Sequence, residues 1–495
     1  MPAKNEQDMA LTGIQGLDDV LQGGLTRGHM FLLEGEPGAG KTTVAIQFLL
    51  EGVRLGERCL YISLSETEDE LRDTIASHGW TIPELFRIYQ LAPSEEVLGD
   101  EKRQSLLYSS DLELGETTRQ IFEAIDRFKP SRLVLDSLSE IRLLAQSSLR
   151  YRRQILSIKH YFSKLQATVL FLDDLTAESG DKTVHSIAHG VIRLEEIAPD
   201  YGAGRRRLRV SKYRGRRYRG GYHDFSIEHG GVRVYPRLIA LEHHSRYSRD
   251  RLSTGNPAFD KLLGGGVEKG SSTLILGPAG TGKSLIAISF TIAAMERGEK
   301  AAMFVFDEEL DLLFDRTRVL GLDLEKHVAN GSLFIEQVDA AQVTPGELAY
   351  RARELVDTRG ISTAIIDSIN GYRAAMPEET SLILHLHELL QYLNRRGAST
   401  FMTVAQHGIV GSMDAPVDIT YLADTVILLR YFEAKGEVRR AVSVVKKRGG
   451  EHEATIREYK IGRGGITLGE PLSAFTGVLL GVPTYNGASL PAQES

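Results

Sequence analysis

Two glycine-rich segments with one shared pattern constrain this sequence more than any other feature. They read GEPGAGKT at residues 35–42 and GPAGTGKS at residues 277–284. Each follows an apolar run and precedes an amphipathic one, which predicts a strand, a phosphate-binding loop and a helix in both places. Backbone N–H groups of such a loop surround phosphate oxygens while its lysine neutralises their charge. The sequence therefore predicts two nucleotide sites, whose lysines Lys41 and Lys283 stand 242 residues apart (283 − 41).

The predicted ATP contacts come from each loop and from the first turn of the helix after it. In chain order they are Gly35, Gly38, Ala39, Gly40, Lys41, Thr42, Thr43, Gly277, Gly280, Thr281, Gly282, Lys283, Ser284 and Leu285.

Magnesium ligands are predicted from the same loops and from one later strand in each half. The hydroxyls of Thr42 and Ser284 close the two loops, and the runs RLVLDS and TAIIDS place Asp136 and Asp367 at the ends of apolar strands. An acid at the carboxyl end of a buried strand can hold the Mg²⁺-bound water beside the phosphates. We predict that Thr42 and Asp136 form the Mg²⁺ site of the first half, and that Ser284 and Asp367 form that of the second half.

The repeat extends well beyond the loops. LTGIQGLDDVLQGGLTRG at 11–28 matches STGNPAFDKLLGGGVEKG at 253–270, so the chain contains two copies of one domain. Short β-branched runs alternate with helical patterns in each copy, which predicts an α/β fold with a mostly parallel sheet covered by helices on both faces. We expect a flexible N-terminus at 1–10, a first domain at 11–240, a linker at 241–252, a second domain at 253–482 and a disordered tail at 483–495.

A further group of acids lies between each loop and the strand of Asp136 or Asp367. The segments LYISLSETEDEL and MFVFDEELDLLF each end a strand in carboxylates, and we place this strand beside the strand of the phosphate loop. A carboxylate there can accept a proton from the group that attacks the γ-phosphate. We predict this catalytic role for Glu66, and for Asp307 with Glu308. The alternative is an acidic helix start, which is our interpretation of Glu68, Asp69 and Glu70.

A basic pair stands near the end of each copy. Lys212 and Arg214 lie in SKYRG, and Lys446 and Arg448 lie in VKKRG. Alternate residues of a strand face the same way, so both cations of a pair can point at one anion. We predict catalytic fingers that reach the ATP of a neighbouring subunit.

The composition limits the class of protein. Hydrophobic residues make up 42%, charged residues 25%, and the formal net charge is −7. No stretch approaches about 18 uninterrupted apolar residues, and the polar start MPAKNEQD has no signal-peptide core, so we expect a cytoplasmic protein without a membrane partner. The single cysteine, Cys59, excludes an intramolecular disulfide and a cysteine-based zinc or iron–sulfur site. We interpret Cys59 as a small buried strand residue.

Several of these motifs together resemble the KaiC family. They are the doubled phosphate loops, the T-G-x-x-x-x-D-x-x-L-x-G-G signature, the paired acids and the K-x-R-G pairs, and they extend over roughly residues 10 to 482. The resemblance implies tandem RecA-like domains and a homohexamer of two stacked rings, with ATP and Mg²⁺ between adjacent subunits. It also implies ATP hydrolysis in the first ring, and a second ring that transfers phosphate to the protein's own serine and threonine.

The family's catalytic glutamates do not transfer evenly. The pair falls on Ser65 and Glu66 in the first half, and on Asp307 and Glu308 in the second half. At least one carboxylate survives in each site, and the K-x-R pairs transfer unchanged.

The family's Ser-Thr acceptor pair, counted back from Asp424, falls on Thr420 and Tyr421. Thr420 keeps an alcohol, so we expect it to be the phosphoacceptor, with Tyr421 and Ser412 as weaker alternatives. The chain stops soon after LLGVP, where KaiC continues into a peptide that binds KaiA, so we do not expect KaiA-type regulation. A signalling or KaiB-like partner stays open, as for KaiC homologues outside the cyanobacterial clock.

Two other functional classes stay open. A nucleic-acid motor or recombinase is favoured by residues 205–219, which hold nine basic residues in fifteen with two interleaved tyrosines. The acidic net charge and the lack of a zinc motif or accessory DNA-binding module argue against a nucleic-acid partner. A nucleotide-gated scaffold is favoured by Ser65 in the first half, and the intact acids of the second half argue against it.

Overall fold

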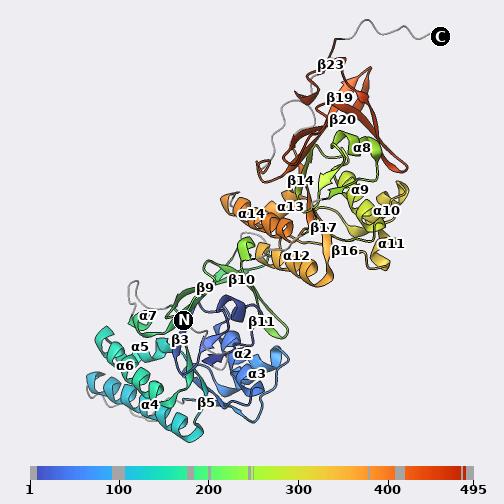
Figure 1. Cartoon of the computed structure of the whole chain (residues 1–495). Helices are drawn as coiled ribbons and strands as arrows, with labels where there is room; N and C mark the ends of the chain where they lie inside the picture. The colour runs from blue at the N-terminus through green and yellow to red at the C-terminus, as the bar shows by residue number, and fades with distance from the viewer. Residues whose placement is uncertain are drawn as a thin grey trace, which may run out of the picture. The chain divides into compact units, whose positions relative to one another are not determined.

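The computed structural model describes residues 8–91, 106–175, 183–198, 202–242, 247–248, 250–376, 379–406, 418–480 and 483–486. Residue contacts divide the chain into two compact units, Met1–Arg237 and Leu238–Ser495 (Figure 1). The backbone N–H of Ala240 donates to Glu388 Oε2 at 3.0 Å, and Leu238 and Ala240 belong to an apolar core of the second unit. Residues 238–242 therefore pack with the second unit.

The first unit is built on one nine-stranded sheet in the order β11-β10-β9-β8-β3-β7-β6-β4-β5. Six neighbouring strands from β8 to β5 run parallel, and β9, β10 and β11 continue antiparallel. The strands are β3 Met30–Glu34, β4 Cys59–Ser63, β5 Phe86–Gln90, β6 Arg132–Asp136, β7 Thr168–Asp173, β8 Gly190–Ile197, β9 Arg205–Tyr213, β10 His223–Glu228 and β11 Gly231–Tyr235, with a small separate pair β1 Met9–Ala10 and β2 Leu25–Thr26.

Helices cover both faces of this sheet, and each face has its own apolar core. The helices are α1 Leu17–Val20, α2 Lys41–Arg54, α3 Glu68–Ser77, α4 Leu106–Phe128, α5 Leu138–Ala145, α6 Ser148–Leu165 and α7 Thr183–Ile187. Side chains of α2 and α3 fill the first core, and side chains of α4, α5 and α6 fill the second.

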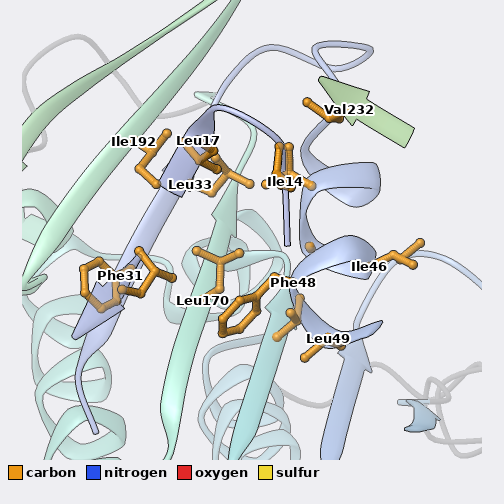
Figure 2. Close-up of a cluster of buried hydrophobic side chains, with 14 of the residues drawn as sticks. Ile14, Leu17, Phe31, Leu33, Ile46, Phe48, Leu49, Leu170, Ile192 and Val232 are labelled. Carbon is orange, nitrogen blue, oxygen red and sulfur yellow. The ribbon is translucent and has the colours of Figure 1, made fainter. Parts of the chain in front are cut away.

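Helix α2 is fixed to the sheet by its apolar face (Figure 2). Phe48 and Leu49 of α2 pack in the same cluster as Leu33 of β3 and Leu170 of β7, each at most 2% exposed. Burying one such side chain stabilises the fold by about 1.5–3 kcal/mol. This packing holds the first turn of α2, which begins at Lys41, over the end of β3.

The second unit repeats this architecture in the order β16-β15-β17-β18-β14-β19-β20-β21-β22. Its strands are β14 Ser272–Gly277, β15 Lys300–Val305, β16 Leu333–Gln337, β17 Ile361–Asp367, β18 Ser399–Ala405, β19 Thr425–Ala434, β20 Glu437–Lys447, β21 Arg457–Gly462 and β22 Gly465–Pro471, with small pairs β12 Arg251–Leu252 with β13 Val267–Glu268 and β23 Phe475–Thr476 with β24 Thr484–Tyr485.

Its helices also lie on both faces of the sheet, because α9 and α10 contribute to one core and α12 and α14 to the other. The bounds are α8 Pro257–Leu262, α9 Lys283–Glu296, α10 Leu310–Val319, α11 Leu324–Ala329, α12 Pro345–Arg359, α13 Ile369–Ala375 and α14 Glu379–Arg395, with short 3₁₀ turns η3 Ala240–Glu242 and η4 Val478–Leu480.

The predicted fold class is confirmed: two α/β domains of RecA-like type follow each other in the chain. The duplication reaches fine detail, since the same irregularity in register occurs between Val191 and Ile192 of β8 and between Val426 and Ile427 of β19. Cys59 is buried as the first residue of β4, as expected. None of the described helices is long and apolar enough to cross a membrane.

One expectation about strand neighbours is wrong. The strand that leads to Glu66, β4, does not lie beside the loop strand β3, because β7 and β6 separate the two. In the second unit β18 and β17 separate β14 from β15 in the same way. Parallel strands are joined by long crossover connections, so successive strands need not be neighbours. The acids lie in the segments that follow β4 and β15.

Candidate nucleotide sites

The first phosphate loop joins β3 to α2 and has the backbone that its glycines allow. Gly38 and Gly40 have φ of 85° and 95°, a region that only glycine adopts at little cost. A Cβ on Gly40 would stand 2.6 Å from Ile227 Cδ1. A side chain there would therefore also clash with the Ile227 side chain of β10. Within the loop Ala39 is fully buried. Thr43 of α2 is 7% exposed, and the Gly35 N–H donates to Asp173 O at 3.1 Å.

Lys41 is held by three acceptors. Its Nζ donates to the carbonyl oxygens of Gly35 at 2.9 Å and Glu36 at 3.0 Å, and it forms an ion pair with Asp174 Oδ1 at 2.9 Å. An ammonium group has three N–H donors. In this structure all three are occupied by protein oxygens.

Asp136 ends β6, as predicted, and its carboxylate is buried beside the loop. Tyr61 donates a hydrogen bond of 2.5 Å to Asp136 Oδ2, and the Thr42 hydroxyl also interacts with Tyr61. Burial raises the pKa of Asp136 to about 6, although the Tyr61 hydrogen bond acts in the opposite direction. This carboxylate lies where an added positive charge would be favourable.

Glu66 lies in the segment after β4 and points a buried carboxylate oxygen at no protein donor. Its Oε2 has no hydrogen-bond partner among the described residues. The backbone around it is fixed, because Ser63 Oγ accepts from the Glu66 N–H at 2.9 Å and donates to its carbonyl at 2.6 Å. Burial and then the charge of Asp136 raise the pKa of Glu66, which makes it a better proton acceptor.

The acids after Glu66 have the helix-start role that we expected for them. Thr67 caps α3 by accepting from the Glu70 N–H, and the Glu70 side chain accepts from the Thr67 N–H at 2.8 Å. Glu70 is therefore part of a capping box.

Asp174 is a site residue that we did not predict. It follows the end of β7, the strand between β3 and β6, and its Oδ2 accepts from Ser137 Oγ at 3.3 Å and Ser139 Oγ at 3.0 Å. The available signal was an acid after an apolar strand, FLDD, the same pattern that identified Asp136. Without the strand order, nothing in the sequence places this strand between the loop and Asp136.

The second phosphate loop joins β14 to α9 with the same backbone. Gly280 and Gly282 have φ of 78° and 92°, and a Cβ on Gly282 would stand 2.7 Å from Ile461 Cδ1. Lys283 donates to Pro278 O at 2.8 Å, and burial lowers the pKa of its ammonium group. Of the other predicted contacts, Thr281 and Leu285 are buried and Ser284 is half-buried.

Asp367 ends β17, in the position of Asp136, but its donor is different. Thr403 Oγ1 donates to Asp367 Oδ1 at 2.5 Å. The two predicted acids after β15 are both engaged: Asp307 Oδ2 accepts from Ser368 Oγ at 2.5 Å, and Glu308 Oε2 accepts from Arg316 at 2.7 Å. Glu308 is thus ion-paired, whereas its counterpart Glu66 has a free oxygen.

The two Lys/Arg pairs have one arrangement in both units. Lys212 Nζ donates to His185 O, and Arg214 donates to Ser186 O at 2.5 Å. Lys446 Nζ donates to Thr420 O at 2.8 Å, and the Arg448 guanidinium donates to Tyr421 O at 2.7 Å. The lysines lie on β9 and β20, and each arginine follows its strand by one residue. Among the described residues, neither pair bonds the phosphate loop of its own unit.

The predicted phosphoacceptor lies in the segment that the second pair holds. Thr420 Oγ1 donates to Asp418 Oδ1 at 2.7 Å, and the Tyr421 side chain is 50% exposed. Ser412 lies outside the described residues.

These residues fit a magnesium nucleotide. Mg²⁺ in proteins is bound by one or two carboxylates together with substrate phosphates. Within the described ranges no group of three or more His, Cys, Asp or Glu could hold a metal alone. Asp136 and Asp367 can contribute such carboxylates, and Glu66 Oε2 has no hydrogen-bond donor among the described residues.

Two phosphate loops at the carboxyl ends of parallel strands, each with an acid at the end of the strand two positions away, define tandem RecA-like P-loop ATPase domains. The KaiC ATPase family matches residues 10–239 and 252–473. The chain belongs to this family.

Curated relatives agree over nearly the whole chain. The circadian clock protein KaiC3 of Synechocystis sp. is 27% identical over 97% of this chain and 95% of its own length. The circadian clock oscillator protein KaiC of Thermosynechococcus vestitus is 28% identical over 96% and 91%. The circadian clock protein KaiC2 of Synechocystis sp. is 28% identical over 97% and 86%.

Proposed function

We propose that this protein is a Mg²⁺-dependent ATPase with two active sites, and that its second domain is a serine/threonine autokinase. The observation that carries the ATPase is Glu66, whose buried carboxylate oxygen lacks a protein partner beside the phosphate loop. Such a group is suited to accept a proton from an attacking water.

Each residue has a distinct part in this proposal. Lys41 and Lys283 bind phosphate oxygens, and the loop N–H groups orient them. The hydroxyls of Thr42 and Ser284 with Asp136 and Asp367 would hold Mg²⁺, which neutralises charge on the phosphates when it is bound. In the second domain Asp307 and Glu308 would accept the proton of the attacking hydroxyl.

The autokinase proposal rests on Thr420 and the basic pair that holds it. Lys446 and Arg448 bind the carbonyls of Thr420 and Tyr421, so they fix the backbone that carries the predicted acceptor. We propose that this segment meets the ATP of an adjacent subunit, since neither pair bonds its own loop. The fitting assembly is the double-ring homohexamer, with a signalling or KaiB-like protein as a further partner.

The nucleic-acid alternative is less favoured by the structure. Arg206 and Arg207 of the basic strip form ion pairs with Glu196 and Glu195 of the next strand, both at 2.9 Å. Lys212 and Arg214 are engaged with backbone carbonyls. Part of the charge that would bind a phosphate backbone is therefore already neutralised.

The test is ATP hydrolysis with phosphopeptide mapping, applied to the wild type, Lys41→Ala and Lys283→Ala. We expect hydrolysis in the wild type, partial loss in each variant, and phosphate at Thr420 that Lys283→Ala alone abolishes. Hydrolysis without phosphate would leave the ATPase and remove the autokinase. DNA-stimulated, salt-sensitive hydrolysis would support the alternative.

A further inference from the structure

The two nucleotide sites differ in how the loop lysine is neutralised. Lys41 uses all three donors on Gly35 O, Glu36 O and Asp174 Oδ1. Lys283 donates only to Pro278 O among the residues that the structure describes. A phosphate oxygen can therefore bind Lys283 without displacing a protein group, but at Lys41 it must replace one.

The difference comes from one position in the sheet. Glu34 of β3 lies opposite Asp173 of β7, and Leu276 of β14 lies opposite Val404 of β18. Because Glu34 and Leu276 each precede the first glycine of their loop, the next residues on β7 and β18 are equivalent. These residues are Asp174 in the first unit and Ala405 in the second.

The serine after the predicted Mg²⁺ aspartate also has a different partner in the two units. Ser137 and Ser368 each follow the predicted Mg²⁺ aspartate. In the first unit Ser137 Oγ donates to Asp174 at 3.3 Å, and in the second unit Ser368 Oγ donates to Asp307 at 2.5 Å. The position of Asp307 is Ser65 in the first unit, so the first site has lost an acid there and has one beside its lysine instead.

Asp174 is also held in place independently of Lys41. Ser139 Oγ donates to its Oδ2 at 3.0 Å, while its Oδ1 faces Lys41. The equivalent of Ser139 is Asn370, which instead bonds the backbone of Ala405 at 2.8 and 3.1 Å. Lys41 is 7% exposed and Asp174 is 29% exposed, so solvent screens this ion pair less than a surface pair.

We propose that Asp174 is a positioning residue that holds Lys41 as its counter-ion until ATP displaces it, which makes nucleotide binding in the first domain weaker than it would be without this acid. A ligand that must first break an internal contact loses affinity by the fraction of sites in which that contact is open. This inference rests on the proposed ATPase function, because it assumes that both loops bind ATP.

The test measures each site separately in the full chain. In a Lys283→Ala background, the affinity for Mg·AMP-PNP and the KM for ATP report on the first site. We expect Asp174→Ala to tighten binding roughly tenfold, as for loss of one charge-assisted contact. The KM should fall by the same factor with kcat changed by less than about threefold, because the contact is broken before the chemical step. Asp174→Glu, which keeps the charge, should bind like the wild type.

The second domain offers the reverse experiment. In a Lys41→Ala background, Ala405→Asp should weaken Mg·AMP-PNP binding by a similar factor. Asp173→Asn is the control for charge alone, since Asp173 is paired with Arg142 at 2.6 Å and its side chain is not among the partners of Lys41 in the described part of the chain. Thermal unfolding checks that every variant is folded, and Asp174→Asn replaces Asp174→Ala if the alanine variant is not.

The outcomes separate the two proposals. If the wild type binds no nucleotide at either site, the proposed function fails. If it binds, but Asp174→Ala leaves the affinity unchanged, matches Asp173→Asn, or lowers kcat at constant KM, the counter-ion inference alone is overturned.

Discussion

Lys446 holds Thr420 by its backbone: the Lys446 Nζ donates to the Thr420 carbonyl oxygen at 2.8 Å, and to that of Ala423 at 2.8 Å. Lys212 holds His185 in the same way in the first unit. This contact of a strand lysine with a backbone carbonyl, which we call the clasp, therefore occurs in both copies of the fold. The hydroxyl of Thr420 occurs in only one copy. In both copies the lysine fixes the backbone of this segment. The side chain at the position of Thr420 decides whether the segment can accept phosphate.

Replacing Lys446 should reduce autophosphorylation. Lys446→Ala removes two hydrogen bonds from the segment of Thr420, so we expect at least a tenfold slower phosphorylation of Thr420, since misplacing an acceptor is costly in rate. Quantitative phosphopeptide mapping measures the effect. Lys460→Ala, an exposed lysine on β21, is the control. Normal phosphorylation in Lys446→Ala would argue against a role for the clasp.

Glu66 should be essential for hydrolysis in the first domain. In a Lys283→Ala background, Glu66→Gln should lower kcat by about 10²–10⁴-fold through loss of the proton acceptor, while nucleotide binding is retained. Steady-state ATPase assays measure this. Glu70→Gln changes an exposed acid of the helix cap and should keep activity. Equal losses in both variants would contradict the assignment.

His223 should make the first domain sensitive to acid. Its Nδ1 accepts from the Arg237 N–H at 2.8 Å and its Nε2 faces Arg219 O at 3.0 Å, an arrangement that requires the neutral ring. Burial lowers the pKa of His223 from 6.5 to about 4. The unfolded state therefore binds the proton more readily, and stability present above pH 6.5 is lost as the pH falls toward 4. The loss is at most about 3–4 kcal/mol.

Fluorescence of Trp80 measures this loss, because it is the only tryptophan and lies in the first unit. Urea unfolding between pH 4.5 and 7.5 should show the pH dependence in the wild type and less of it in His223→Gln. Replacing the exposed His160 should leave the dependence unchanged. An identical pH profile for His223→Gln and the wild type would refute the prediction.

Arg132 should be a large contributor to the stability of the first unit. It is fully buried, forms an ion pair with Glu57 at 2.6 Å, and donates to the carbonyls of Leu11 and Phe48. Arg132→Ala would leave Glu57 with Arg27, at 2.6 Å, as its remaining cationic partner, and would also remove a donor from the two carbonyls. We therefore expect this variant to cost about 3–5 kcal/mol. Trp80 fluorescence in urea provides the measurement. Arg119→Ala removes exposed ion pairs and should not shift the midpoint; similar shifts in both variants would count against the prediction.

The features that sequence alone could predict are those set by short segments. The phosphate loop needs glycine at positions 38 and 40 because the backbone there has positive φ. This requirement can be recognised from the amino-acid sequence. The same holds for Asp136, which ends a run of apolar strand residues, and for the repeat of both patterns. These local requirements predicted the fold class correctly, and they are the basis of the domain bounds and of the site residues that we propose.

Contacts between strands were decided only by the tertiary structure. Asp174 reaches Lys41 because β7 lies next to β3, and Glu66 follows a strand, β4, that is three positions away from β3. Crossover connections permit many strand orders, and a side-chain contact across strands depends on that order and on the register. The sequence by itself determined that there are two phosphate loops, while the packing of the sheet decided that Asp174 is the acid that pairs with Lys41.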